Sequence, residues 1–535
     1  MFIIESKAEE VFMSRYYKNG SELNKKILDG VNKLTDNVAS TLGPKGRNVI
    51  LYQKGGTPIV TKDGVTVAKF VEFDDPFENV GAQIIKQAAQ NTNTNAGDGT
   101  TTSTVLAREI LVQAQKYLAT GVSPIELKRG MDKAVTEIVK NLDELSIPVS
   151  SLQDIKHIAT ISANGDDIIG ELVSTAIDLV GKDGSITIEE SKSLTTILDT
   201  VEGFRFDSGY FSKSFVTDER RGAVVYDNPL ILVTDHRVEQ LEEILPILEV
   251  VARENKPLII VAEEVEGQAL AALIMNTVRG TMKIAAVKAP RYGEERRSIL
   301  KDLCISTGAT FMSRSSGINL ADTKLEHLGR AKKIDVIKNN TTIIDGDAAW
   351  EEVEKRIDSL KEEITQTEDI HECERIQERI TRLASGVAII KVGAASEIEM
   401  IEKKHRVEDA LEAVRSAQQE GTVTGGGTAL IRAAHKLKVM TDNDEQAIGV
   451  EIIKKSLTGP IKQMALNAGE SPDLIINKVL KAKDTRLGWN FSTGKMVNMY
   501  EAGIIDPKKV TRNALENAAS VSSTLLTTSY AIVEE

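Results

Sequence analysis

The sequence has few residues of several kinds, and each shortage narrows what the protein can do. Only two of its 535 residues are cysteine, Cys304 and Cys373, so no disulfide framework is implied and a reducing compartment is expected. Aromatic residues make up 4% of the chain, which disfavours a nucleic-acid platform built from stacked rings. The formal net charge of −13 argues against a generally basic nucleic-acid binder. We therefore expect no nucleic acid among the partners of the protein.

Long hydrophobic runs are also missing. The longest ones, such as PLIIVA at 257–262 and GVAIIKVGAA at 386–395, fall well short of the roughly 20 residues that a membrane-spanning helix needs. The N-terminal segment contains early acidic residues and no long apolar stretch, so it matches neither a secretory signal nor an arginine-rich transit peptide. These absences predict a cytoplasmic protein that does not bind membranes.

The sequence does contain enough material for several packed cores. Hydrophobic residues make up 41% of a chain that is long enough for about three domains. Residues 21–144 and 405–535 have mostly helical patterns, and the segment 41–64 predicts a β-hairpin with a Gly-Gly turn. Apolar β-runs alternate with helices over 202–387, which is typical of βα units around a partly parallel sheet. We expect a β/α insert within a mainly helical protein, with one long charged helical stretch at 351–384.

An unusual polar segment, NTNTNAGDGTTTSTVLA at 91–107, leads into a helical pattern. The backbone N–H groups at the start of a helix favour anions such as phosphate, and Gly97 and Gly99 permit a close approach of the backbone. The threonines at 100–102 add hydroxyl donors. Asp98 would repel a phosphate unless a cation lay between them, and Mg²⁺ selects hard oxygen ligands of this kind. Two interpretations follow from this segment alone: a Mg²⁺-nucleotide site, and an Asp- and Thr-rich helix cap.

Other segments favour the nucleotide site. TLGPKG at 41–46 and TKDG at 61–64 are predicted turns that each carry a lysine, and the second places it beside Asp63. GTVTGGGTAL at 421–430 is a glycine-rich start to another helix, and Asp409 lies on a further helix. Each segment alone is more typical of a turn or a solvated face, but together they supply phosphate donors, two spare carboxylates and a backbone slot for a base. No G-x-x-x-x-G-K-[ST] pattern occurs, which disfavours an ordinary P-loop ATPase.

Longer motifs resemble those of the group I chaperonins, the bacterial GroEL and mitochondrial heat-shock type, in order along most of the chain. They include TLGPKGRNV, AGDGTTTSTVLA, TISANGD, VKAPRYGEERR, RVEDALEAVRSA and GTVTGGGTALIR. The resemblance implies a multidomain chaperonin fold with a mainly α-helical equatorial ATPase domain, a small α/β intermediate domain and an inserted β/α apical domain. The implied boundaries are 1–144 and 420–535 for the equatorial domain, 145–201 and 388–419 for the intermediate domain, and 202–387 for the apical domain.

The resemblance also implies a site for ATP and Mg²⁺, with K⁺ as an open addition. Asp63 and Asp409 correspond to the hydrolytic carboxylates, and Asp98 corresponds to the Mg²⁺ ligand. The residues implied to contact the nucleotide are Thr41, Leu42, Gly43, Pro44, Lys62, Asp98, Gly99, Thr100, Thr101, Thr102, Gly426, Asn490, Phe491, Ser492 and Asp506. The family has small residues at the positions of Phe491 and Ser492, so we expect the contact with the base or ribose to differ here.

Two apolar stripes lie in the region that resembles an apical domain. EQLEEILPILEVV and GQALAALIMNTVRG both place leucine and isoleucine at helical spacing, and periodicity alone favours buried core faces for them. The resemblance instead implies an exposed groove that binds non-native polypeptides and, where one exists, a co-chaperonin lid. The residues implied to line this groove are Tyr210, Phe215, Leu245, Leu248, Leu270, Ile274, Met275 and Asn276.

Three departures from the family leave its assembly open. Ser214 replaces a usual groove tyrosine, the terminal Gly-Met repeats are absent, and Ser471 replaces an acidic residue near the contact between rings. The resemblance predicts an ATP-dependent folding chaperone in seven-subunit rings, with the number of rings and the need for a lid open. The alternatives are a group II-like or lid-independent single-ring chaperonin and a holdase-type paralogue. A metabolite-converting enzyme is disfavoured, because no Ser-His-Asp arrangement or full metal set is recognisable.

Overall fold

The computed structural model describes residues 15–534 apart from 54–57, 182–184, 192, 315, 316, 318, 368 and 385. The chain forms two compact units. The first unit comprises the described residues up to Val173 and from Ile401 onward, and the second comprises Ser174–Met400. The chain thus leaves the first unit and returns to it, as an insert within a helical protein requires. The division into equatorial, intermediate and apical domains stays a prediction.

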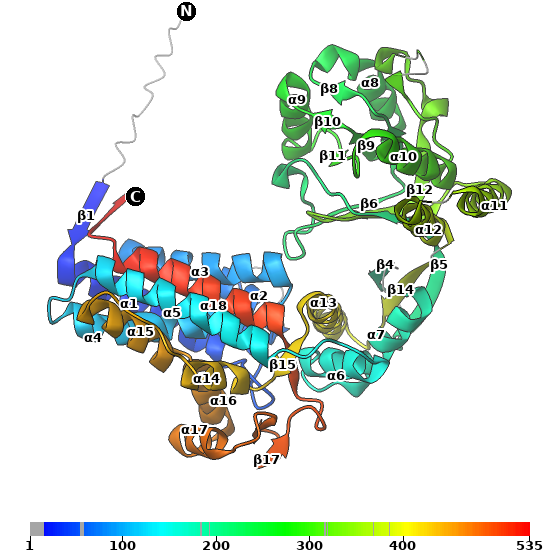
Figure 1. Cartoon of the computed structure of the whole chain (residues 1–535). Coiled ribbons are helices and arrows are strands. Elements are labelled where there is room, and N and C mark those ends of the chain that lie inside the picture. Colours follow the sequence, from blue (N-terminus) through cyan, green and yellow to red (C-terminus); the bar gives the residue numbers. More distant parts are fainter. Residues whose placement is uncertain are drawn as a thin grey trace, which may run out of the picture. The chain divides into compact units, whose positions relative to one another are not determined.

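The first unit is mainly helical (Figure 1). Its helices are α1 (Gly20–Ala39), α2 (Gly64–Phe70), α3 (Pro76–Ala96), α4 (Thr100–Leu118), α5 (Pro124–Leu145), α6 (Leu152–Ser162), α14 (Thr428–His435), α15 (Asp444–Ser456), α16 (Gly459–Ala468), α17 (Pro472–Lys481) and α18 (Lys508–Leu526). Two more helices, α7 (Asp167–Val180) and α13 (Glu397–Glu420), belong partly to the second unit.

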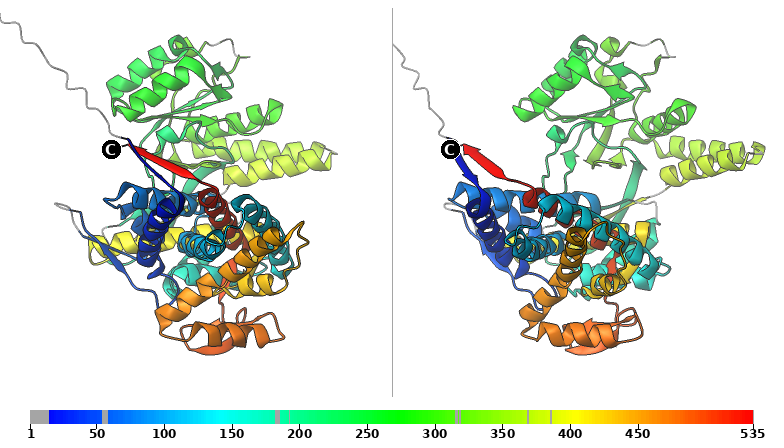
Figure 2. Two further views of the ribbon diagram at one scale, coloured as in Figure 1. Left: turned by 90° about the vertical axis from the view of Figure 1, so that its left-hand side faces the viewer. Right: turned by 60° about the vertical axis from the view of Figure 1, so that its left-hand side comes forward.

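Helices from both ends of the chain pack into one core in the first unit. α18 lies against α3, α4 and α5, and α1 lies against α3 and α4 (Figures 1 and 2). Apolar residues at helical spacing on these helices, such as Leu23, Ile85, Ile110 and Leu515, are fully buried. The shared core explains why two separate parts of the chain form a single unit.

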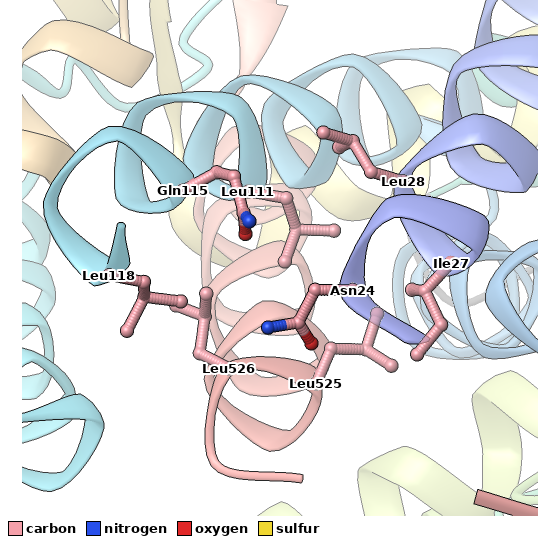
Figure 3. A pocket seen from close by; sticks show the side chains of 8 residues that line it. All are labelled: Asn24, Ile27, Leu28, Leu111, Gln115, Leu118, Leu525 and Leu526. Atoms are coloured by element: carbon pink, nitrogen blue, oxygen red, sulfur yellow. The ribbon is translucent and has the colours of Figure 1, made fainter. Parts of the chain in front are cut away.

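A small cavity lies within this core between α1, α4 and α18 (Figure 3). It has a volume of about 20 Å³ and is lined by Asn24, Ile27, Leu28, Leu111, Gln115, Leu118, Leu525 and Leu526. A space of this size holds about one water molecule, and the amides of Asn24 and Gln115 are the side chains able to bond to it. It is too small for any larger ligand.

Short antiparallel ribbons complete the first unit. They pair β1 (Arg15–Asn19) with β19 (Tyr530–Glu534), β2 (Val49–Leu51) with β3 (Ile59–Thr61), β15 (Thr422–Thr424) with β18 (Ile505–Pro507), and β16 (Leu487–Asn490) with β17 (Lys495–Asn498). The β2–β3 pair confirms the hairpin predicted at 41–64, and its Gly-Gly turn lies outside the described residues. The β1–β19 pair brings the beginning and the end of the described chain side by side (Figure 2).

The second unit is built on a nine-stranded mixed sheet in the order β11-β9-β7-β12-β13-β5-β14-β4, with β6 paired to β12. Its strands are β4 (Ser185–Glu190), β5 (Ile197–Phe206), β6 (Val224–Asp227), β7 (Leu230–Val233), β9 (Leu258–Ala262), β11 (Ile284–Lys288), β12 (Gly329–Val336), β13 (Thr341–Gly346) and β14 (Gly386–Val392). A separate short pair joins β8 (Arg237–Val238) to β10 (Glu264–Val265). The helices are α8 (Leu245–Glu254), α9 (Gly267–Val278), α10 (Gly293–Thr307), α11 (Trp350–Gln366) and α12 (Ile370–Ala384).

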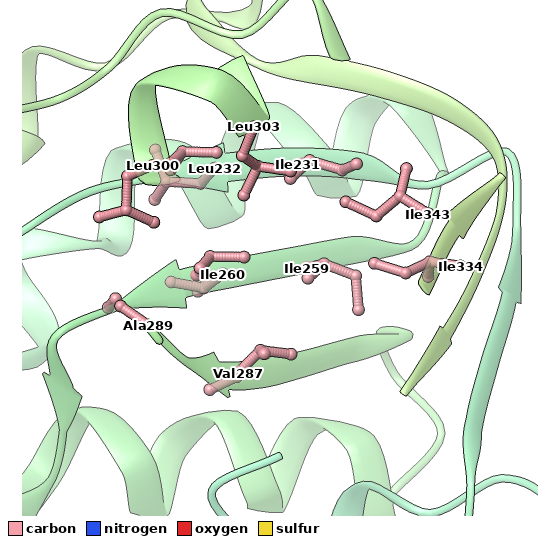
Figure 4. Close-up of a cluster of buried hydrophobic side chains, with 14 of the residues drawn as sticks. Ile231, Leu232, Ile259, Ile260, Val287, Ala289, Leu300, Leu303, Ile334 and Ile343 are labelled. Atoms are coloured by element: carbon pink, nitrogen blue, oxygen red, sulfur yellow. The ribbon is translucent and has the colours of Figure 1, made fainter. Parts of the chain in front are cut away.

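The core of the second unit surrounds the parallel strands β7, β9 and β11. These strands are continuous apolar runs, as expected for strands that are covered on both faces. Leu300 and Leu303 of α10 lie over Ile231 and Leu232 of β7 (Figure 4). The βα units predicted from the sequence are therefore present, with a partly parallel sheet as their centre.

The charged stretch at 351–384 forms two helices rather than the single one expected. α11 ends at Gln366, α12 begins at Ile370, and the two helices pack against each other. A buried ion pair holds α12 on α10, because Arg379 donates two hydrogen bonds to Asp302 at 2.7 and 3.0 Å. Arg356 of α11 donates to the same carboxylate at 3.0 Å. One buried acid therefore joins three helices.

In the part of the chain that the structure describes, no helix is both long enough and apolar enough to cross a bilayer.

Candidate functional site

A cavity of about 500 Å³ opens within the first unit. This volume lies in the range of sites for small molecules and cofactors. Its walls come from the segments 41–44, 62–64, 98–102, 161–165, 424–430, 489–492 and 504–511 together with Asp409. Every nucleotide-site residue named from the sequence lines it, although those residues lie far apart along the chain. The fold thus brings the predicted set together at one place, while the role of each residue stays a prediction.

The threonine turn forms one end of this cavity. α3 ends at Ala96, and Gly97 and Gly99 adopt the left-handed conformation with φ of 74° and 90° before α4 begins at Thr100. A Cβ at Gly99 would lie 2.6 Å from Cγ1 of Val510, so the turn requires glycine there for both conformation and space. The start of α4 presents backbone N–H groups and threonine hydroxyls to the cavity, which is an arrangement suited to phosphate.

Carboxylates gather beside this turn. Asp98 accepts hydrogen bonds from the Gly99 N–H and, at 3.1 Å, from the Ser162 hydroxyl. Burial raises the pKa of Asp98, and the charge of Asp63 adds to the effect. Burial also raises the pKa of Asp506 to about 7, with Asp98 contributing and the Gly426 N–H opposing. These carboxylates disfavour one another's charge, so their donor set fits a bound cation.

The oxygen donors suit Mg²⁺ in particular, because Mg²⁺ commonly binds proteins through one or two carboxylates and takes its other ligands from phosphate and water. Among the residues that the structure describes, no group of three or more His, Cys, Asp or Glu side chains could hold a metal ion.

Asp63 and Lys62 lie at the start of the short helix α2. The Asp63 carboxylate caps this helix, because it accepts the N–H groups of Val65 and Thr66 at 3.1 Å each and the Thr66 hydroxyl at 2.6 Å. The cap fixes the orientation of the carboxylate at the cavity. Burial lowers the pKa of Lys62, while Glu402 acts in the opposite direction. A lysine in this setting gains from an anionic ligand.

Asp409 reaches the cavity from the long helix α13. One turn earlier, Arg406 donates to Asp166 at 2.9 Å and also pairs with Glu402. At the end of the helix, Glu420 accepts a hydrogen bond from Arg512 of α18 at 2.6 Å. The segment of α13 that carries Asp409 is therefore attached to the rest of the first unit on both sides.

The segment 489–492 forms another part of the cavity wall. The Trp489 indole donates to Glu470 at 2.6 Å, and the ammonium of Lys478 lies 4.7 Å from the centre of its ring. The Asn490 side-chain oxygen accepts the N–H groups of Ser492 and Thr493 at 2.9 and 3.2 Å, which fixes the turn. Phe491 is buried in an apolar cluster with Trp489. Phe491 makes this part of the wall more aromatic than the small residues that the family has at this position.

The sequence analysis missed several residues of the cavity. Ile161, Ser162, Asn164 and Gly165 line it, and Ser162 bonds directly to Asp98. They belong to the TISANGD motif, which carried the resemblance but received no role. Met464, Trp489 and Val510 also line the cavity. Only their places in the fold assign them to the site, because apolar residues of this kind give no local signal.

The apolar surface expected on the second unit is smaller than the resemblance implied. Leu245 and Met275 are 44% and 47% exposed, and Tyr210, Leu270, Ile274 and Asn276 are partly exposed. Phe215 and Leu248 are core residues, with 0% and 6% exposure, so their assignment to an exposed surface does not hold in this structure. Leu248 lies on the buried face of α8 together with Ile247 and Val251, whereas Leu245 lies outside that face.

The fold and the site together define a chaperonin subunit: both ends of the chain form a helical unit with a polar cavity, and a β/α unit is inserted between them. The sequence matches the TCP-1/cpn60 chaperonin family over residues 34–535, and the chain belongs to this family. Its structure is similar to the crystal structure of chaperonin gp146 from the bacteriophage EL 2 (Pseudomonas aeruginosa), determined in the presence of ATP-BeFx. The TM-score is 0.64 at 20% sequence identity, covering 97% of this chain and 99% of gp146. The predicted chaperonin fold is confirmed.

Proposed function

We propose that the protein is an ATP-dependent chaperone that hydrolyses Mg-ATP in the 500 Å³ cavity and captures non-native polypeptides on the second unit. The observation that carries the proposal is the convergence of the phosphate-binding turn, the carboxylates and Asp409 on one cavity in a member of the chaperonin family. The similar phage chaperonin was crystallised in the presence of ATP-BeFx, which supports the same ligand here.

In this proposal the triphosphate lies at the start of α4. The N–H groups and hydroxyls of Thr100–Thr102 donate to phosphate oxygens, and Lys62 supplies a positive charge. Asp98 would hold Mg²⁺, which supplies neutralisation of the phosphate charge when it is bound. The wall at 489–492 and Gly426 face the adenosine. The triphosphate and the base are thus recognised by separate segments of the chain.

The hydrolytic step follows from the two remaining carboxylates. The oxygen of a water molecule bonds to the γ-phosphorus while the bond from that phosphorus to the β–γ bridging oxygen breaks, which gives ADP and inorganic phosphate. Asp409 orients the water and accepts its proton. Asp63, held by its helix cap, provides a second acceptor near the same water. Because α13 carries Asp409, any movement of this helix would couple hydrolysis to conformation.

Polypeptide capture is assigned to the exposed apolar side chains of the second unit. Leu245 and Met275 are the most exposed of the predicted set, and Tyr210, Leu270, Ile274 and Asn276 lie partly open beside the core. Hydrophobic burial is not directional, so such a surface accepts many partly unfolded chains. Methionine adds side-chain adaptability. A co-chaperonin lid, where one exists, is proposed to compete for the same residues.

Assembly into seven-subunit rings, single or double, is part of the proposal, and two exposed ribbons on the first unit support contacts between copies of the chain. Tyr17, Tyr530 and Ile532 are 66%, 67% and 62% exposed on the β1–β19 ribbon, and Ile50 is 69% exposed on β2. Exposed apolar strands with free edges favour pairing with another chain. We propose that a second copy covers these ribbons.

The proposal is tested by measuring ATP hydrolysis and native mass together. Asp409→Ala should lower kcat at least about 100-fold, as expected for the loss of a general base, while Mg-ATP binding and native mass stay unchanged. Glu399→Ala, an exposed acid on the same helix that does not line the cavity, is the matched control and should hydrolyse ATP normally.

The outcomes separate the candidate functions. Full turnover by Asp409→Ala would contradict the mechanism. A wild-type protein that binds unfolded polypeptide without hydrolysing ATP would be a holdase instead. A stable monomer with and without Mg-ATP would exclude a folding chamber.

A further inference from the structure

We propose that Arg432 is a positioning residue of the nucleotide site, which holds the wall that faces the base at a fixed distance from the glycine loop on α14. The inference rests on the proposed ATPase function and concerns recognition of the base rather than hydrolysis. Arg432 does not line the cavity itself, so its effect would pass through the backbone that it binds.

The first observation is the unusual environment of Arg432. Its side chain is 7% exposed, and in the described part of the chain no carboxylate forms an ion pair with it. Its guanidinium instead donates to the backbone carbonyls of Ala482, Asp484 and Leu487, at 3.3, 2.9 and 2.7 Å. Burial lowers the pKa of Arg432, with the charge of Asp484 acting in the opposite direction. A buried cation is costly to the fold, so its three backbone acceptors indicate a specific task for it.

The second observation is the position of those three carbonyls in the chain. These carbonyls lie in the segment from Ala482, which follows α17, to Leu487, the first residue of β16, and β16 ends with Trp489 and Asn490 of the cavity wall. The guanidinium therefore fixes the beginning of the segment whose end faces the base. Trp489 is held separately by Glu470 and Lys478.

The third observation is that α14 adjoins both the glycine loop at 426–427 and the strand that carries the wall at 489–490. Its first turn follows Gly426 and Gly427, which line the cavity, and Arg432 lies near its other end. α14 also approaches β16 closely, because a Cβ at Gly488 would lie 2.7 Å from the hydroxyl oxygen of Thr428. One short helix thus follows the glycine loop and is hydrogen-bonded to the segment that leads into Trp489 and Asn490. In this proposal the three hydrogen bonds of Arg432, together with the packing of Thr428 on Gly488, set the spacing between the glycine loop and the wall at 489–490.

The phosphate end of the cavity meets the glycine loop at Asp506, which accepts the Gly426 N–H. Its groups come from α2, α4 and the carboxylates beside them, and none of these contacts involves Arg432. Loss of the guanidinium should therefore loosen the base wall and leave the triphosphate and the attacking water in place. The expected signature is a weaker preference for one base, without a loss of maximal turnover.

The test measures kcat and KM of the full-length protein for Mg-ATP and Mg-CTP. The wild-type protein should prefer ATP in kcat/KM. In Arg432→Met the KM for ATP should rise at least about tenfold and the preference for ATP over CTP should fall, while kcat changes less than about twofold. Arg432→Lys keeps one charged donor and should give an intermediate result. Lys133→Met removes a cation that joins α5 to Asp442, away from the cavity, and should change none of these quantities.

Each outcome decides between support and rejection. A graded loss of base preference across Lys and Met supports the inference. An unchanged preference in both variants, a loss of kcat that matches the rise in KM, or a wild-type protein with no base preference would each overturn it. Absence of ATP hydrolysis in the wild-type protein would instead reject the proposed function. Arg432→Lys keeps the test valid if Arg432→Met fails to fold.

Discussion

The two units differ in whether their buried carboxylates are paired with cationic side chains. In the second unit, Asp302 is 1% exposed and lies between Arg379 and Arg356, and Asp235 receives hydrogen bonds from Arg297 and Ser313. In the described part of the first unit, Asp98 and Asp506 line a cavity, accept hydrogen bonds from backbone N–H and hydroxyl groups, and have raised pKa values. A carboxylate that is balanced by the protein's own cations holds a fold together. One that is left unbalanced at a cavity marks the place of a charged ligand.

The largest expected effect concerns Asp98, one of the carboxylates at the cavity. Asp98→Asn should lower kcat/KM for Mg-ATP by at least about 1,000-fold, because bound Mg²⁺ is worth several kcal/mol to the transition state and would lose its protein ligand. The same change should not destabilise the ligand-free protein, because it removes a charge that burial disfavours. Steady-state ATPase assays and thermal unfolding without Mg²⁺ measure the two effects. Wild-type turnover in this variant would remove Asp98 from the site.

The next largest effect concerns Asp302, the buried carboxylate that is paired with arginines. Asp302→Asn should lower the free energy of unfolding of the second unit by about 3–5 kcal/mol, because it leaves the buried Arg379 without its counter-charge. Urea unfolding followed by circular dichroism measures the loss. The exposed Asp345, which lies 3.9 Å from Lys332 in the same unit, provides the control: Asp345→Asn should cost about 0–1 kcal/mol. Equal losses in both variants would contradict the distinction.

The pH dependence of the free energy of unfolding tests the same comparison at Asp506. Burial raises the pKa of Asp506 to about 7 in the folded protein, above its ordinary value of 3.8, so the folded state keeps a proton that the unfolded chain releases. Its contribution to stability is therefore complete below about pH 4 and is lost as the pH rises through about 7. Asp506→Asn should remove this loss, so its stability advantage over the wild-type protein should grow between pH 4 and pH 7. Unfolding midpoints at several pH values, in a chelator and without nucleotide, measure the difference. A constant advantage would contradict the raised pKa.

The smallest expected effect on stability concerns the surface of the second unit. Leu245→Ser and Met275→Ser should change the free energy of unfolding by less than about 0.5 kcal/mol each, because both side chains are largely exposed. They should still reduce capture of a chemically unfolded polypeptide several-fold, as measured by suppression of its aggregation. The fully buried Leu273 on α9 shows the opposite behaviour: Leu273→Ala should cost about 2–5 kcal/mol. Unchanged capture by both serine variants would contradict the proposed surface.

The sequence allowed the cavity to be predicted better than the surface, and the reason is physical. Asp63, Asp98 and Gly99 belong to turns and helix caps, whose chemistry is local, and all of them line the cavity. The exposure of Phe215 and Leu248 depends on which face of the segment meets the sheet, and periodicity cannot give that. A regular pattern also hid the break between α11 and α12, which contains neither glycine nor proline.

Two further residues show where sequence reasoning stops. Ser162 lies in the TISANGD motif, whose polar residues are a local signal of a turn at a site, and it donates to Asp98. Arg432 offered no such signal, because an arginine on a helix is typical of a solvated face. Only the fold places its guanidinium among three carbonyls of a distant turn.

The packing of α18 against the first helices sets an order for synthesis on the ribosome. All of the second unit, from Ser174 to Met400, leaves the exit tunnel before α18 is made, and its core is continuous along the chain. The first unit must wait, because α18 completes its core and Val510 and Thr511 complete the cavity. A chain that is released early therefore carries the surface proposed to capture polypeptides without a complete cavity. Such a truncated product would expose the apolar faces of α3, α4 and α5 and would be a natural target for proteolysis.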